Sequence, residues 1–515
     1  MTHWADKTAE RILKLQIGNA PLTCASGISP SGPVHVGNLR DIVTIWFVGK
    51  ALKERGVPVR FIHSWDNFDR FRKVPINIPE HFTEFIGKPL SKVPDPFNCC
   101  PSYAAHYQIE FETSLLEMGI QIEFLNQTKL YEDGAYCDAI MEAVSARHAI
   151  YDILQKFRTQ AGSAEERGGY YPIILYCEHC GKDTTRIVAS SEGNISYHCT
   201  ECKHDGKQNS KIAKNIKLPW KVDWAMRWRH EKVVFEPGGK DHATAGGSFN
   251  VSSEIAKDIF HYRPPIFQPY EFIGLKGLTG KMSGSSGVLL TPADALKVYQ
   301  PEVLLSVFAK MPPNKAFDLV LDDGIYRVYD EFDRANSKTP VERDIALSRI
   351  LGRAPHPVAF KQLAGFCGIV QGNHDALELV FDRMGTPCQK ELFKERLEKA
   401  EHWLSEYAPE QRLMLLEKRD DDYFNTITPI QKNWIIFLHN FLEKKQCTLE
   451  ETTHHVYEIP KTGQPPDTDL ALLQRDFFKI IYHLLFGKEK GPRLGTFFAA
   501  VPKARYLPLL NFRGI

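Results

Sequence analysis

Hydrophobic and polar positions near the amino terminus follow the order strand, turn, helix, strand. The apolar, β-prone run PLTCASGI leads into a glycine-rich turn, SGISPSGPVHVGNLRD, at residues 26–41. After the turn, apolar residues recur at the spacing of one helical face: Leu39, Ile42, Val43, Trp46 and Phe47. Gly56 is suited to end that helix, and the compact run VPVRFIHSW after it is typical of a strand covered on both faces. The pattern predicts a βαβ unit and therefore a parallel sheet.

A second unit of the same kind begins near residue 233. The segments KVVFEP, GGKDHATAGGS, FNVSSEIAKDIF and YEFIGL repeat the order strand, glycine loop, helix, strand, and KGLTGKMSGSSG follows them. The two halves of one sheet are then separated by an insertion at residues 96–217. From about residue 340 the apolar positions keep the helical period, as in the stripe from Leu392 to Tyr407. This predicts an all-α carboxyl-terminal domain.

Composition narrows the class of protein without naming a function. The 515 residues exceed what one core can hold, and 43% hydrophobic with 25% charged residues is typical of globular chains. Lys plus Arg (64) nearly balance Asp plus Glu (63), so a nucleic acid, neither implied nor excluded, would need a local basic face. The amino terminus lacks the apolar core of a signal peptide, and no uncharged run approaches the roughly 18 residues of a spanning helix. We therefore expect a cytoplasmic protein without a membrane segment.

Four of the eleven cysteines form two Cys-x-x-Cys pairs separated by eighteen residues: Cys177, Cys180, Cys199 and Cys202. This spacing is typical of a zinc ribbon, in which four thiolates leave no open position, so the metal would be structural. Unmetallated thiols are the alternative, and His198 and His204 are alternative ligands. The remaining cysteines have no such spacing and are interpreted as packing or surface residues: Cys24, Cys99, Cys100, Cys137, Cys367, Cys388 and Cys447.

The opening turn and the later KMSGSS segment both suit a nucleotide. Glycines let the backbone approach a phosphate, and the helix that follows offers free N–H groups, to which His35 and Asn38 add donors on its first turn. Lys281 and three serine hydroxyls lie in a glycine-flanked loop that can close over a triphosphate. Taken singly, the first could be a tight turn capped by Ser31 or Asn38, and the second a solvated loop.

Together, the two segments resemble the HIGH and KMSKS signatures of class I aminoacyl-tRNA synthetases. The blocks ASGISPSGPVHVGN, FIHSWDNFDRFRKVP, LPWKVDWAMRW, GGKDHATAGGSFN and GKEKGPRLGTFF resemble class I lysyl-tRNA synthetase, the form of archaea and some bacteria, including spirochaetes. They extend nearly to residue 500. Two positions depart from the signatures, since Asn38 replaces the last histidine of HIGH and Gly284 the second lysine of KMSKS.

The resemblance implies a Rossmann-type α/β catalytic domain with a zinc-ribbon insertion, followed by an all-α domain. It divides the chain into a first catalytic half (1–95), a connective insertion (96–217, ribbon at about 170–210), a second catalytic half (218–290), a stem-contact-like linker (291–345) and a helical anticodon-binding domain (346–515). It also implies ATP-dependent attachment of L-lysine to tRNA(Lys) by a protein that we expect to be a monomer, with Mg²⁺ accompanying ATP and Zn²⁺ in the ribbon. The basic segment GKEKGPR could contact tRNA, or it is solvated surface.

The site residues follow from the motifs and the resemblance. Four are predicted to be catalytic: His35, Asn38, Lys281 and Ser283. The predicted ATP contacts are Pro30, Ser31, Gly32, His35, Gly37, Asn38, Lys281, Met282, Ser283, Gly284 and Ser285. The resemblance places around the amino acid Gly27, Ser29, Trp220, His242 and Tyr270.

Lysine itself requires a carboxylate for its ammonium and an apolar channel for its methylenes. Carboxylates near predicted strand ends are Asp66, Asp223 and Asp241, and aromatic residues for the channel are Trp220, Trp224 and Tyr270. Trp224 and Trp228 could equally pack in the core as one helix face, and His242 could be a structural cap. The alternative functions are a class I synthetase for glutamate or arginine, a non-catalytic tRNA-binding paralogue and a simple nucleotidyltransferase.

Overall fold

The computed structural model describes most of the chain and divides it into two units. The described residues are 2–16, 21–158, 160, 162–191, 193–209, 214–276, 289–353, 356–370, 374–444, 448–463, 465 and 469–513. Unit 1 comprises Met1–Leu296, Pro301–Val320 and Lys338–Leu351, and unit 2 comprises Lys297–Gln300, Leu321–Ser337 and Gly352–Ile515. The finer division into five segments stays a prediction. Among the described residues no helix has the length and apolar character that crossing a membrane requires.

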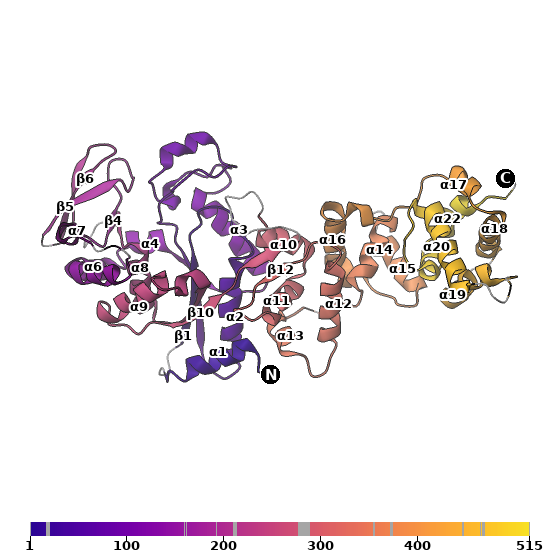
Figure 1. Ribbon diagram of the computed structural model, residues 1–515, viewed down its shortest axis with the longest axis horizontal. Coiled ribbons are helices and arrows are strands. Elements are labelled where there is room, and N and C mark those ends of the chain that lie inside the picture. The colour runs from indigo at the N-terminus through magenta and orange to yellow at the C-terminus, as the bar shows by residue number, and fades with distance from the viewer. Residues whose placement is uncertain are drawn as a thin grey trace. The chain divides into compact units, whose positions relative to one another are not determined.

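Unit 1 is built on a five-stranded sheet in which every neighbouring pair is parallel (Figure 1). Its strands are β1 (Leu22–Ile28), β2 (Val59–Trp65), β3 (Glu123–Asn126), β9 (Val233–Gly239) and β10 (Ile266–Tyr270), in the order β10-β9-β1-β2-β3. The order reverses direction between β1 and β9. In open parallel sheets ligands bind beyond the carboxyl ends of the strands at such a reversal. The predicted parallel sheet is therefore confirmed, and its topology marks where to look for a site.

Helices cover this sheet because apolar residues form their inner faces. The sheet-covering helices are α2 (Leu39–Lys53), α8 (Trp220–Glu231) and α9 (Ser248–Asp258), and α1 (Trp4–Leu13) packs on α2. Trp224 and Trp228 are buried in a core shared with Ile62 and Val233 of the sheet, so their predicted packing role is confirmed. Helix α2 begins at Leu39, after Asn38, so His35 lies in the turn and not, as predicted, on the first helical turn.

The insertion contains helices followed by a small antiparallel sheet. Two short helical turns, η1 (Glu80–Phe85) and η2 (Leu90–Lys92), precede the predicted bounds of 96–217. Within these bounds the helices are α3 (Tyr103–Glu117), α4 (Gln127–Glu132), α5 (Cys137–Ser145), α6 (Arg147–Lys156) and α7 (Ala164–Gly169). Strand β3 of the main sheet also lies within them, so the insertion begins after β3 and not, as predicted, at residue 96. Strands β4 (Ile174–Leu175) and β8 (Ile216–Lys217) pair with each other, and β5 (Thr185–Ser191), β6 (Asn194–Cys199) and β7 (Asp205–Asn209) form a three-stranded sheet. Apolar residues of this part, such as Tyr197 and Cys199, belong to the same core as the main sheet.

The last strand of the main sheet differs from the prediction. The sequence placed it at YEFIGL, but β10 is Ile266–Tyr270, and β11 (Ile273–Leu275) pairs instead with β12 (Phe317–Leu319) in a separate two-stranded sheet. The chain leaves the main sheet at Glu271, whose N–H donates to the carbonyl of Pro313. The other elements of unit 1 are η3 (Lys240–Ala243), α11 (Pro301–Lys310), α13 (Arg343–Ser348) and most of α10 (Pro292–Val298).

The described residues of unit 2 form helices and no strand, which confirms the predicted helical carboxyl-terminal region (Figure 1). The helices are α12 (Ile325–Asn336), α14 (Phe360–Val370), α15 (His374–Arg383), α16 (Lys390–Glu406), η4 (Pro409–Gln411), α17 (Asp421–Thr426), α18 (Pro429–Lys444), α19 (Leu449–Glu458), η5 (Ile459–Lys461), α20 (Leu470–Phe486), α21 (Leu494–Ala500) and α22 (Lys503–Leu510).

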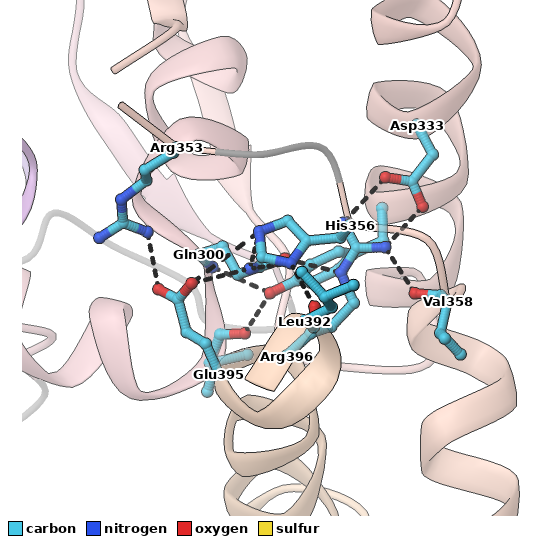
Figure 2. A network of polar contacts seen from close by, with 10 residues as sticks. Gln300, Asp333, Arg353, His356, Val358, Leu392, Glu395 and Arg396 are labelled. Carbon is cyan, nitrogen blue, oxygen red and sulfur yellow. Dashed lines mark hydrogen bonds and ion pairs between the residues drawn. The ribbon is translucent and has the colours of Figure 1, made fainter. Parts of the chain in front are cut away.

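A buried arginine joins four segments of unit 2 (Figure 2). The guanidinium of Arg396 on α16 donates to both carboxylate oxygens of Asp333 on α12, at 2.8 Å each, and to the carbonyl of Val358 at 2.9 Å. Its Nε donates to the side-chain oxygen of Gln300 at 2.6 Å. Arg396 is fully buried, so its charge depends on these partners.

We predict that Arg396→Met lowers the free energy of unfolding by about 3 kcal/mol, because the change leaves Asp333 and Gln300 without their partner. Urea unfolding followed by circular dichroism measures the effect. Arg327→Met on the same unit is the matched control, since Arg327 forms only an exposed pair with Glu331. Equal stability of the two variants would contradict the role assigned to Arg396.

Candidate active site

A cavity of about 460 Å³ opens where the strand order reverses. Its lining comes from the ends of β1, β9 and β10, the start of α2, the segment after β2 and the β4–β8 pair. The lining residues that the sequence analysis singled out are Gly27, Ser29, His35, Gly37, Asn38, Asp66, Trp220, Asp241, His242 and Tyr270. The parallel strands bring the segments after β1, β2, β9 and β10 to one edge, and the antiparallel β4–β8 pair of the insertion lies beside them, so residues from distant parts of the chain share one cavity.

The corner between β1 and α2 depends on two close approaches. A Cβ on Gly27 would lie 3.2 Å from the carbonyl oxygen of Ser64, so the neighbouring strand leaves little room for a side chain there. Gly37 donates its N–H to Nδ1 of His35 at 3.1 Å, and a Cβ on Gly37 would lie 2.8 Å from the same ring. Because Nδ1 accepts, the neutral ring carries its proton on Nε2, which makes that nitrogen a donor.

The first turn of α2 carries a buried carboxylate that the sequence analysis missed. Asp41 follows Asn38 by three residues, so both lie on the helix face that lines the cavity. Oδ2 of Asp41 accepts the hydroxyl of Tyr270 at 2.8 Å, and the buried Oδ1 has no hydrogen-bond partner among the described residues. Burial raises the pKa of Asp41 well above the usual carboxyl range, and nearby Glu236 and Asp241 add to the shift. Such a group offers an acceptor to a cation.

Two carboxylates predicted to bind lysine are instead engaged with an arginine. Arg227 on α8 donates to Asp66 and to Asp223, at 2.6 Å each, and all three side chains are buried. Tyr131 donates to the other oxygen of Asp223. Asp66 lines the cavity and Asp223 does not. The sequence could not show this pairing, because Arg227 and Asp66 are distant along the chain.

Aromatic residues line the cavity beside this ion-pair network. Trp220, at the start of α8, stacks on Trp224 with ring centroids 4.9 Å apart. The guanidinium of Arg227 lies 5.2 Å from the centroid of the Trp220 ring. His242 meets Trp224 edge to face at 5.5 Å. Trp220 and His242 are only half-buried and line the cavity, whereas Trp224 is buried in the core. Trp220 and His242 therefore form the aromatic part of the cavity wall.

The other predicted ATP contacts are not part of the described lining. Of the described residues, Pro30, Ser31 and Gly32 belong to the same turn but do not line the cavity. The five predicted residues of the KMSKS-like loop lie outside the described residues: Lys281, Met282, Ser283, Gly284 and Ser285. The described segment that follows this loop contacts the turn between β1 and α2, because the carbonyl of Leu290 accepts the N–H of Val36 at 2.8 Å.

The sequence matches a family model described as tRNA synthetases class I (K), over residues 2–350. The chain belongs to this family. It is 33% identical over 536 residues to the lysine–tRNA ligase of Thermococcus kodakarensis, with all of both chains covered. It is 34% identical over 529 residues to that of Treponema pallidum, covering 99% and 98% of the two chains. It is 35% identical over 524 residues to that of Borreliella burgdorferi, covering 98% of each. The resemblance to class I lysyl-tRNA synthetase is confirmed.

In this class I synthetase the four cysteines of the ribbon come together. Their sulfur atoms all lie within 4.8 Å of one another, and the Cys177–Cys202 and Cys180–Cys199 sulfur pairs are each 3.7 Å apart. A tetrahedral ion with Zn–S bonds of about 2.3 Å requires sulfurs about 3.8 Å apart. His198 and His204, the alternative ligands, contact Asp205 and Glu178 instead. The residues present therefore fit a four-thiolate metal.

A second group of metal ligands was not predicted. Ligand atoms of Asp95, Cys99, Cys100 and His106 also lie within 4.8 Å of one another. The Cys99 sulfur is 3.2 Å from Nδ1 of His106 and 3.6 Å from the Cys100 sulfur, and that nitrogen is 3.5 Å from Asp95. The two cysteines, interpreted from the sequence as packing or surface residues, are thus part of a mixed S, N, O donor set. The spacing Asp-x₃-Cys-Cys-x₅-His was the signal in the sequence.

Proposed function

We propose that this class I synthetase activates L-lysine with ATP and transfers it to tRNA(Lys). The observation that carries the proposal is the buried carboxylate of Asp41, whose Oδ1 lacks a partner among the described residues in a cavity that begins at the HIGH-like corner. An amino acid with a cationic side chain fits that carboxylate, and glutamate does not. The full-length similarity to lysine–tRNA ligases supports the same substrate.

The ATP end of the cavity is the corner between β1 and α2. Nε2 of His35 and the amide of Asn38 are donors suited to the phosphates, and the backbone at Gly37 and the start of α2 adds N–H groups. Mg²⁺ would neutralise charge on the phosphates when bound with ATP. The role of Lys281 and of the serines in its loop is inferred from the resemblance alone.

The lysine end lies toward β9 and β10. We assign the ε-ammonium to Asp41, with Tyr270 holding the carboxylate in place, because Asp66 and Asp223 are both already bound to Arg227. Trp220 then covers the methylenes, where contact with a cation or its stem contributes about 0.5–2 kcal/mol. Gly27, Ser29 and His242 line the same space and complete the predicted set.

The chemistry needs position and charge stabilisation more than a protein nucleophile. A lysine carboxylate oxygen forms a bond to the α-phosphorus of ATP, the bond to the bridging oxygen breaks, and pyrophosphate leaves. The terminal ribose hydroxyl of tRNA then attacks the carbonyl carbon, and AMP leaves. The donors at His35 and Asn38 face the phosphates, where charge changes in the first step.

We also propose that both groups of ligands hold Zn²⁺. The four-thiolate group has no open position, and the second group uses four protein donors as well, so both ions would be structural. Backbone N–H groups of Phe97, Cys99 and Cys100 hold the Asp95 carboxylate, as is usual for a metal-binding carboxylate. The monomer and the cytoplasmic location expected from the sequence stay predictions.

The first prediction concerns specificity. Exchange of radioactive pyrophosphate into ATP, measured with each of the twenty amino acids with and without tRNA, should require lysine. His35→Ala should slow the exchange by roughly 10² to 10³, the effect of losing one donor to the phosphates, without changing tRNA affinity. Stimulation by arginine or glutamate in place of lysine would refute the substrate. Unchanged exchange in His35→Ala would refute the site.

The second prediction concerns Asp41. Asp41→Asn should raise the KM for lysine on the order of 10²-fold and leave that for ATP unchanged, because a buried charge pair is lost. Since burial raises the pKa of Asp41, lysine binding releases a proton, and wild-type affinity for lysine rises with pH through that pKa. Calorimetry in two buffers of different ionisation enthalpy detects this proton, which the variant should not release.

Asp41→Asn should weaken lysine binding but stabilise the lysine-free protein. A carboxyl whose pKa is raised on folding lowers the stability of the free protein as the pH rises above its unfolded pKa, and the loss is complete above its folded pKa, so Asp41→Asn should raise the melting temperature of the lysine-free protein increasingly over that range. Asp241→Asn is the comparison in the same cavity, because Asp241 is exposed and affects Asp41 through its charge, so its loss should lower the pKa of Asp41. A larger rise of the lysine KM in Asp241→Asn than in Asp41→Asn would show that the ammonium binds Asp241 and not Asp41.

The third prediction concerns the two groups of metal ligands. Plasma mass spectrometry of the purified protein should find one zinc for each group, and Cys180→Ser and Cys99→Ser should each remove one. Cys137→Ser is the control, since Cys137 belongs to neither group. The second site is refuted if the wild-type protein contains a single zinc ion and the Cys99→Ser variant still contains it.

A further inference from the structure

The turn between β1 and α2 is held from outside by a tyrosine of α3. The hydroxyl of Tyr103, at the start of α3, donates to the carbonyl of Ser31 at 2.9 Å. The tyrosine side chain is fully buried, and burial raises the pKa of its hydroxyl, so the group stays protonated and donates. The contact joins segments that are 72 residues apart along the chain, and Tyr103 itself does not line the cavity.

The start of α3 is well anchored. The N–H of Tyr103 donates to the carbonyl of Val93 at 2.9 Å, and the side chain of Ser102 caps the helix. The ligand group that begins at Asp95 and ends at His106 has members on both sides of Tyr103 along the chain. The hydroxyl of Tyr103 is therefore presented to the turn from a part of the structure that is fixed independently of the turn.

The hydrogen bond from Tyr103 sets the direction of one peptide group in the turn. The peptide between Ser31 and Gly32 is trans, so its C=O and N–H point in opposite directions. Because the C=O points to Tyr103, the N–H of Gly32 points away from it. Gly32 is half-buried, and no described residue accepts this N–H. The turn therefore holds a donor that is available to a ligand, between the cavity-lining residues Ser29 and His35.

We propose that Tyr103 is a positioning residue for ATP, whose hydroxyl keeps the N–H of Gly32 turned toward the phosphates. This rests on the proposed function, in which ATP binds at this corner. A donor that is already oriented needs no reorganisation when the nucleotide binds. Without the hydroxyl the peptide is free to turn over, because glycine adopts φ of either sign. The carbonyl oxygen of Ser31 would then face the phosphates and repel them.

The first experiment removes the hydroxyl and keeps the ring. In pyrophosphate exchange with lysine, Tyr103→Phe should raise the KM for ATP about fivefold, the effect of losing one hydrogen bond, and leave the KM for lysine unchanged. Tyr107→Phe is the matched control, because Tyr107 lies one turn further along α3 and its ring centroid is 5.1 Å from that of Tyr103. The buried hydroxyl of Tyr107 has no hydrogen-bond partner among the described residues, so its loss should change neither KM.

A second experiment detects the effect on the turn without the reaction. Hydrogen–deuterium exchange is followed in residues 29–38 with ATP alone, at a concentration near the wild-type KM. ATP should slow the exchange in the wild type and in Tyr107→Phe, and it should slow the exchange less in Tyr103→Phe. Equal protection by ATP in all three proteins would contradict the positioning role.

The kinetic outcomes separate positioning from general support of the fold. The proposal is overturned if Tyr103→Phe leaves the KM for ATP unchanged, if it raises the KM for lysine as much as that for ATP, or if Tyr107→Phe has the same effect. A wild-type protein without lysine-dependent exchange would refute the proposed function. Normal exchange by the wild type, with an unaltered KM for ATP in Tyr103→Phe, would refute this inference alone.

Discussion

The common direction of five strands is the constraint on which the site depends. Because β1, β2, β9 and β10 are all parallel, the segments after each of them meet at one edge of the sheet. The order reverses between β1 and β9, so no crossover covers the edge there. The close approach of Gly27 to Ser64 and the fit of His35 over Gly37 shape the corner at that point. The parallel strands thus bring distant segments of the chain to one cavity.

Charge is distributed over this edge in two different ways. Asp66 and Asp223 both bind Arg227, which gives the wall beside Trp220 a fixed geometry. Asp41 is equally buried but holds only the hydroxyl of Tyr270. The first arrangement holds its carboxylates against a buried cation, whereas the second leaves a carboxyl whose pKa is raised by burial, so a cation that binds there must displace its proton. Specificity for a cationic side chain is therefore connected with a cost in stability.

Much of this could be predicted from the sequence, and the failures have physical causes. Periodicity predicted the parallel sheet and the helical region, because burial on one or two faces leaves a local signal. It set the start of the insertion too early, since β3 has only 4 residues and gives no such signal. It misplaced the last strand, since β10 and β11 are both short and only pairing distinguishes them. The motifs located the corner, but the pairing of Asp66 with Arg227 and the isolation of Asp41 are long-range facts. The ligand group at Asp95 was missed because its donors mix three residue types.

The central claim is that the carboxylate of Asp41 receives the ε-ammonium of lysine. The most direct measurement is a crystal structure of the protein with a non-hydrolysable lysyl-adenylate analogue. We predict that the terminal nitrogen lies within hydrogen-bond distance of Oδ1 of Asp41 and that the adenylate phosphate lies beside His35 and Asn38. A terminal nitrogen bound to Asp66 or Asp241, with Asp41 facing away from the ligand, would contradict it.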